Sequence, residues 1–109
     1  MRKIVIDMQN YLFADAVAAA FKSSDYDIEV IRAESPRDTV ELCQIYEPFV
    51  LVMEVTGYAP WKLGERLRLR DEVKALCPNC KIALMVDSNT ERQTAKDIRD
   101  AKKDGLIDQ

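Results

Sequence analysis

Apolar residues follow two different periods along this chain, one typical of strands and one typical of helices. Four short runs of mainly aliphatic residues are almost unbroken by polar ones, the pattern of strands buried on both faces of a parallel sheet. These runs predict strands over residues 3–8, 27–33, 49–55 and 81–87. Between them, apolar residues recur every three or four positions, which predicts helices over residues 10–24, 35–48, 60–76 and 88–105.

Local signals mark where some of these helices begin and end. Asn10 is a plausible N-cap for the first helix, and Pro36 suits the first position of the second. Ser88 and Glu91 have the spacing of a capping box, which would open the fourth helix. Gly105, directly after the lysine-rich last turn, should close it.

The alternation of strands and helices, with short connections, predicts an α/β fold in which helices cover a parallel sheet. Right-handed crossovers restrict the topology to a few doubly wound strand orders. The 109 residues have no repeats or linkers and should form a single domain. Residues 106–109 stand where a fifth strand would start. We therefore expect either a four-stranded architecture or a chain truncated at its C-terminus.

Composition narrows the functional class. Apolar residues make up 48% and charged residues 32% of the chain, which is ordinary for a globular domain. The net charge of -3 argues against nucleic acid as a direct partner. No apolar run approaches the roughly 18 residues of a membrane span, and the start lacks a signal-peptide pattern, so we expect a cytoplasmic protein without membrane contact. Histidine is absent, which excludes histidine-based catalysis and histidine metal ligands.

The three cysteines include a C-x-x-C pair, Cys77 and Cys80, a spacing that can support redox or zinc chemistry. Only Cys43 remains as a further thiol, so one chain cannot supply a four-cysteine zinc site. A redox pair belongs at a helix start, where the helix dipole lowers the thiol pKa, whereas this pair follows a helix. We predict free, structural thiols, which also suit a reducing compartment.

Four phrases, in this order and spacing, resemble a response-regulator receiver domain, the module of two-component phosphorelay signal transduction. They are RKIVIDMQNYLF (2–13), EPFVLVMEVTG (47–57), CPNCKIALMVDSN (77–89) and AKKDGLID (101–108). The resemblance covers essentially the whole chain. It implies a flavodoxin-like sheet of strand order 2-1-3-4, with the fifth strand and last helix of receivers largely absent from this chain.

Receivers accept a phosphoryl group on an aspartate that ends the third strand. Mg²⁺, held by that aspartate and by two acids after the first strand, offsets the charge of the phosphoryl oxygens. A threonine or serine on the fourth strand and a lysine after the fifth strand then bind the phosphoryl group. The resemblance therefore implies specific residue types at five positions.

This chain departs from the receiver pattern at nearly all of these positions. The resemblance puts Glu54 at the phospho-acceptor position, Met8 and Gln9 at the two acidic positions, and Val86 at the threonine or serine position. Asp7 lies one residue early, and a one-residue step along a strand turns a side chain to the other face. The lysine position falls at or beyond the last residue. We expect no bound Mg²⁺, no other cofactor and no catalytic residue.

Two interpretations of Glu54 remain open from the sequence. It is either a strand-end carboxylate hydrogen-bonded to loop amides, or a fixed negative charge that imitates phosphoaspartate. Under both, we expect a non-enzymatic pseudo-receiver that is not phosphorylated and acts by protein–protein interaction, with a partner or effector domain, in signal transduction or transcription regulation. The alternatives are a weakly active receiver whose Asp7 and Glu54 still hold a metal, and an unrelated small flavodoxin-like binding protein.

Three surface features bear on possible partners. Arg66 and Arg70 share a face of the third helix, which we expect to be solvated, an acidic-partner patch being the alternative. Tyr58 and Trp61 either anchor a partner or pack against the start of that helix. Without a fifth strand, residues 81–86 would form an apolar sheet edge, so we also predict self-association, for example as a homodimer.

Overall fold

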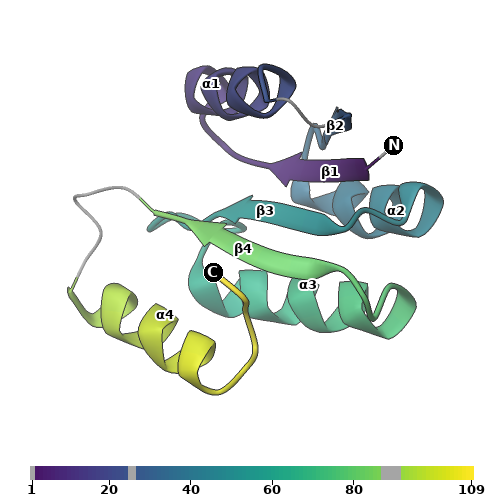
Figure 1. The fold of residues 1–109 in the computed structure, drawn as a ribbon. Coiled ribbons are helices and arrows are strands. Elements are labelled where there is room, and N and C mark those ends of the chain that lie inside the picture. Colours follow the sequence, from purple (N-terminus) through teal and green to yellow (C-terminus); the bar gives the residue numbers. More distant parts are fainter. Residues whose placement is uncertain (1, 25–26, 87–91) are drawn as a thin grey trace.

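Strands and helices alternate from one end of the molecule to the other (Figure 1). The computed structural model describes residues 2–24, 27–86 and 92–109. Within these residues the elements are β1 (Arg2–Asp7), α1 (Tyr11–Lys22), β2 (Ile28–Arg32), α2 (Pro36–Tyr46), β3 (Val50–Glu54), α3 (Leu63–Leu76), β4 (Lys81–Met85) and α4 (Arg92–Lys103). All eight predicted elements are present, with ends that differ from the prediction by a few residues.

The strands form one sheet in the order β2-β1-β3-β4, and every neighbouring pair is parallel. This confirms the predicted α/β fold and its strand order 2-1-3-4. The two central strands are the most buried, because Ile4, Val5, Ile6 and residues 51–53 are each at most 4% exposed. In the register of β1 and β3, Asp7 lies opposite Met53, so the two strands end side by side.

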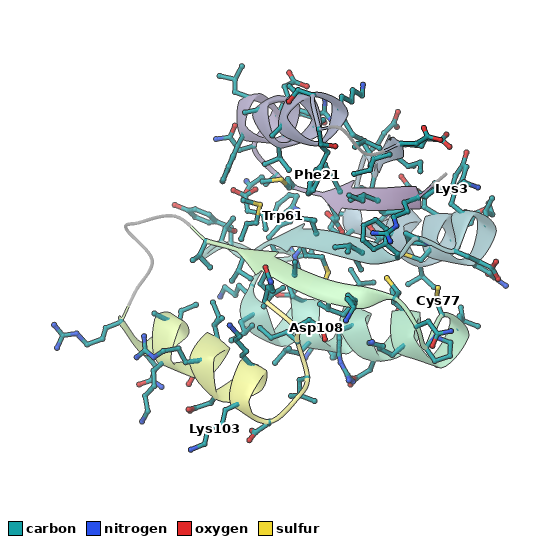
Figure 2. All side chains as sticks on the ribbon, in the orientation of Figure 1. Lys3, Phe21, Trp61, Cys77, Lys103 and Asp108 are labelled. Carbon is teal, nitrogen blue, oxygen red and sulfur yellow. The ribbon has the colours of Figure 1, made fainter. Side chains whose placement is uncertain are left out.

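Side chains alternate between the two faces of the sheet, and each face has its own core. Ile4 and Ile6 of β1 pack with Ala14 and Ala18 of α1 on one face, where Phe21 points from α1 toward the sheet (Figure 2). Val5 belongs to the other face, which α2, α3 and α4 cover. Figure 1 shows α1 above the sheet, and α3 and α4 below it.

Three of the predicted helix signals act as expected. The side chain of Asn10 accepts a hydrogen bond from the backbone N–H of Phe13 at 3.0 Å, and Pro36 is the first residue of α2. Gly105 follows α4 with a φ of 78°, a conformation that glycine adopts without steric cost. The capping box of Ser88 and Glu91 lies outside the described residues.

The third helix begins later than predicted, at Leu63, because the preceding loop closes on itself. The backbone N–H of Thr56 donates to the carbonyl oxygen of Trp61 at 2.9 Å. The backbone N–H of Trp61 donates to the carbonyl oxygen of Tyr58 at 2.8 Å. These bonds hold residues 56–61 in a turn that cannot continue as helix. Trp61 is half-buried in this turn, whereas Tyr58 is exposed.

The last residues of the chain run beside β4. The backbone N–H of Leu84 donates to the carbonyl oxygen of Gln109 at 2.9 Å. The backbone N–H of Asp108 donates to the carbonyl oxygen of Ile82 at 2.8 Å. The carboxylate of Asp108 also accepts from the N–H of Ile82 at 2.8 Å. The expectation of a bare β4 edge is therefore wrong, because the chain's own end pairs with it. Self-association stays a prediction.

No helix in the described part of the chain combines the length and the apolar character that crossing a membrane requires.

Candidate functional site

The carboxyl ends of β1 and β3 bring together most of the residues that the sequence singled out. Asp7 ends β1 and Glu54 ends β3, and open α/β sheets bind their ligands at this edge. The two carboxylates nevertheless serve opposite faces of the sheet. Asp7 lies on the face of α2 and α3, which supply its side-chain partners, whereas Glu54 binds the loop that leads into α1.

The Glu54 carboxylate is bound by main-chain amides. Its Oε1 accepts a hydrogen bond from the N–H of Gln9 at 2.8 Å and one from the N–H of Asn10 at 3.1 Å. These amides stand at the start of α1, where N–H groups lack helical partners and the helix dipole favours negative charge. Of the two interpretations of Glu54, the hydrogen-bonded carboxylate is therefore the one that the geometry shows. Imitation of phosphoaspartate stays a prediction.

On the other face, Asp7 and Arg66 form a buried ion pair. Asp7 is 1% exposed and Arg66 is 0% exposed. Nη1 of Arg66 donates to Oδ2 of Asp7 at 2.8 Å, and Nη2 donates to Oδ1 at 3.2 Å, so the pair is bidentate. The Thr39 hydroxyl, from α2, donates to the same Oδ2 at 2.7 Å. Both carboxylate oxygens thus have protein partners in a side chain that is only 2% exposed.

The Arg66 guanidinium also holds the main chain of both strands. Its Nε donates to the carbonyl oxygen of Glu54 at 2.8 Å, and its Nη2 donates to the carbonyl oxygen of Asp7 at 3.0 Å. Every buried side-chain nitrogen and oxygen atom in the described residues has a hydrogen-bond partner. One side chain from the second turn of α3 therefore ties together the ends of β1 and β3.

Both sequence-based interpretations of Arg66, a solvated face and an acidic-partner patch, are wrong. Its helical neighbour Arg70 is half-buried, and it donates to the carbonyl oxygen of Leu106 at 2.7 Å and to Asp71 at 2.6 Å. A signal for the Arg66 pair did exist in the sequence. Asp7 ends an apolar strand on a face that must be buried, and a buried carboxylate requires a cation or several donors.

The remaining receiver positions do not converge on a metal site. Met8 is buried in the core under α1, Gln9 is exposed, and Val86 lies beyond the end of β4 with 41% exposure. Asp7 is bound to Arg66 and Thr39 on one side of the sheet, and Glu54 is bound to loop amides on the other. This arrangement does not favour the alternative of a weak metal site built from these two residues. No described group of three cysteine, aspartate or glutamate residues has the geometry to hold a metal. The residues present do not fit Mg²⁺.

Cys43, Cys77 and Cys80 are unpaired and lie together in the core on the α2 and α3 face. Figure 2 shows Cys77 near the amino end of the sheet, away from Trp61. A hydrogen bond with the Cys80 thiol and burial raise the pKa of Cys43 above the ordinary value of 9.0. Burial also raises the pKa of Cys77. The hydrogen bond with the Cys43 thiol lowers the pKa of Cys80, but the Cys80 side chain is 0% exposed. The raised pKa values of Cys43 and Cys77 are those of structural thiols, because nucleophilic cysteines have lowered pKa values and are accessible. That all three thiols are structural stays a prediction.

Because the Cys43 thiol is buried, we predict that the free energy of unfolding falls in alkaline solution. Because its pKa is raised in the folded state, the unfolded chain loses the proton first, so the stabilisation is complete below pH 9 and falls above it. We expect a loss of up to about 1.4 kcal/mol per pH unit for this thiol. Urea unfolding at pH 8, 9 and 10 measures it, with Cys43→Ala as the reference. Equal slopes for both proteins would contradict the prediction.

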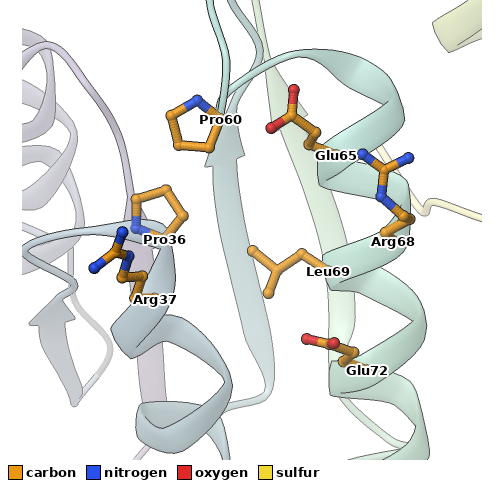
Figure 3. Close-up of a pocket in the computed structure, with 7 residues that line it drawn as sticks. All are labelled: Pro36, Arg37, Pro60, Glu65, Arg68, Leu69 and Glu72. Carbon is orange, nitrogen blue, oxygen red and sulfur yellow. The ribbon is translucent and has the colours of Figure 1, made fainter.

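A pocket of about 270 Å³ opens between the starts of α2 and α3, at the same end of the sheet (Figure 3). Apolar and charged side chains both line it: Pro36, Arg37, Pro60, Glu65, Arg68, Leu69 and Glu72. None of the four charged residues forms an ion pair within the described parts of the chain. This pocket could not be predicted from a local pattern, because its two walls, residues 36–37 and residues 60–72, are separated by more than 20 positions.

Comparison with known proteins identifies the fold. No protein-family model and no curated protein matches the chain. Among solved structures, the chain is similar to the signal receiver domain of a modulated diguanylate cyclase from Desulfovibrio desulfuricans G20, described as an example of alternate folding. The two share 16% sequence identity with a TM-score of 0.65, over 94% of this chain and 75% of that one. At this identity the likeness shows a receiver-like flavodoxin fold and nothing more specific.

Proposed function

We propose that this domain is a pseudo-receiver, a receiver-like signalling module that takes no phosphoryl group and acts by contact with a partner protein or an effector domain. The receiver-like fold supports a place in signal transduction, as does the similarity to a receiver domain of a diguanylate cyclase. The observation that carries the proposal is the state of Glu54, whose carboxylate is already bound by the amides of Gln9 and Asn10.

Two requirements for phosphorylation of a carboxylate support this proposal. The attacking oxygen must be free and in line with the phosphorus atom, and a cation must offset the crowded charge of the phosphoryl oxygens. Glu54 is longer than aspartate by one methylene, and two hydrogen bonds from loop amides to its Oε1 hold the carboxylate against the start of α1. This orientation argues against an in-line attack by its second oxygen, Oε2. Asp7 is paired with Arg66 on the other face of the sheet. The domain is therefore proposed to be non-enzymatic.

The surface around this edge suits protein contact. Four large apolar side chains near the carboxyl ends of the strands are exposed: Tyr11, Leu12, Tyr58 and Val86. Exposed aromatic residues often anchor partners. We propose a protein partner in the cytoplasm and no membrane contact. The net charge of -3 argues against nucleic acid as a direct partner. If the Glu54 charge imitates phosphoaspartate, Glu54→Gln will change the binding of that partner.

Acetyl phosphate with Mg²⁺ should leave this protein unmodified. Without a free in-line carboxylate and a bound cation, we expect no increase in intact mass during an incubation that fully labels an ordinary receiver. Intact-mass spectrometry on both proteins in parallel measures this.

A phosphate adduct that maps to Glu54 and disappears in Glu54→Gln would overturn the proposed function. An adduct that persists in Glu54→Gln would place the reaction at another residue. That result would overturn the statement that the domain takes no phosphoryl group.

A further inference from the structure

The receiver-like fold implies a divalent cation at the carboxyl edge of the sheet, and the residues present do not fit one. At this edge the structure instead carries a covalently attached cation, the Arg66 guanidinium. We propose that Arg66 is the built-in cation of this edge and makes the conformation of the domain independent of divalent ions. The inference rests on the proposed function in one respect, since it treats the domain as one that works without Mg²⁺.

The groups around the guanidinium form an oxygen cradle, defined here as both carboxylate oxygens of Asp7 and the carbonyl oxygens of Asp7 and Glu54. These four atoms accept hydrogen bonds of 2.8–3.2 Å from three different nitrogen atoms of Arg66. The four oxygen atoms of the cradle therefore lie around the planar guanidinium group and do not converge on a single point. A metal ion needs its oxygen ligands about 2.0–2.6 Å from a single centre. The cradle selects a flat, forked cation, a shape that guanidinium has and a metal ion or an ammonium group lacks.

The guanidinium also connects elements that are far apart in the chain. It comes from α3, binds the last residues of β1 and β3, and reaches α2 through the hydroxyl of Thr39 on Asp7. A bound ion could hold the two strand ends only while its concentration was high enough. An attached guanidinium holds them at every ion concentration, so the edge and the start of α3 keep one arrangement.

Removing the guanidinium should leave a site that free guanidinium can fill. In Arg66→Ala the cradle oxygens remain and the planar space is empty. Guanidinium chloride at about 10 mM, far below denaturing concentrations, should raise the melting temperature of this variant by about 2–5 °C relative to equimolar NaCl. MgCl₂ should give no such rise, because the cradle does not converge on one point.

Two controls isolate the cradle. Asp7→Asn/Arg66→Ala has a neutral cradle and should lose the guanidinium effect. The unchanged protein should respond neither to guanidinium at this concentration nor to Mg²⁺ or a chelator, because Arg66 occupies the site. If Arg66→Ala is unfolded at room temperature, the readout is recovery of helical circular dichroism on adding guanidinium.

Each result decides the inference. A rise confined to Arg66→Ala supports it, whereas no rise, an equal rise in the double variant, or stabilisation of the unchanged protein by Mg²⁺ would overturn it. Failure of the guanidinium rescue alone leaves the proposed function intact. A phosphate adduct on Glu54 overturns the proposed function without touching the rescue experiment.

Discussion

Replacing Arg66 with methionine is expected to lower the free energy of unfolding by about 3–5 kcal/mol. Methionine fills much of the same space, so the main loss is the cation that faces Asp7. Asp7 is 1% exposed in the unchanged protein, so its carboxylate would be left buried with only the hydroxyl of Thr39 as a side-chain donor. Domains of this kind are stable by only about 5–15 kcal/mol, so this single change would remove a large part of the total.

Two further variants make the measurement specific. Arg68→Met changes an exposed arginine of the same helix and should shift the free energy of unfolding by less than about 0.5 kcal/mol. Asp7→Leu/Arg66→Met removes both charges and should recover part of the loss, since a buried pair replaced by apolar groups is often near neutral. The recovery should be incomplete, because the Thr39 hydroxyl and the carbonyl oxygens of Asp7 and Glu54 lose their partners. Urea unfolding followed by circular dichroism measures all three. Equal, small effects of Arg66→Met and Arg68→Met would show that the pair contributes little.

Replacing Leu51 with alanine should cost about 2–5 kcal/mol. Leu51 is fully buried on the central strand β3 and packs in the core that α2, α3 and α4 cover. Its neighbours come from several elements and cannot all close around the cavity. Leu12→Ala is the matched control, because Leu12 is 82% exposed and should change stability by less than about 0.5 kcal/mol. Thermal and urea unfolding of both variants test this, and a mild effect of Leu51→Ala would mean that the core collapses around the missing side chain.

The fold was accessible from the sequence because strand and helix patterns are local. The unbroken apolar runs of β1 and β3 follow from burial on both faces, and the caps at Asn10 and Gly105 follow from backbone requirements that few residue types meet. The one-residue offset of Asp7 also indicated correctly that its side chain serves the other face of the sheet.

The Asp7–Arg66 pair was missed for two physical reasons. The partners are 59 positions apart, so no local pattern connects them. Arginine is almost never fully buried, so its position on an amphipathic helix favours a solvated face. The bond from Glu54 to the loop amides was only one of two options, because main-chain donors leave no mark in the sequence. The start of α3 was misplaced because a loop that bonds to itself lacks a strong side-chain signature.

The buried ion pair also constrains how this domain can evolve. A change at Asp7 or at Arg66 alone leaves an uncompensated buried charge, so each single step passes through a strongly destabilised protein. The two positions should therefore be inherited together and be lost together, although they are far apart in the chain. Among related sequences, covariation of these two positions would mark the descendants that share this metal-independent edge. A lineage in which Asp7 varies while Arg66 stays fixed would show that the constraint is weaker than the geometry indicates.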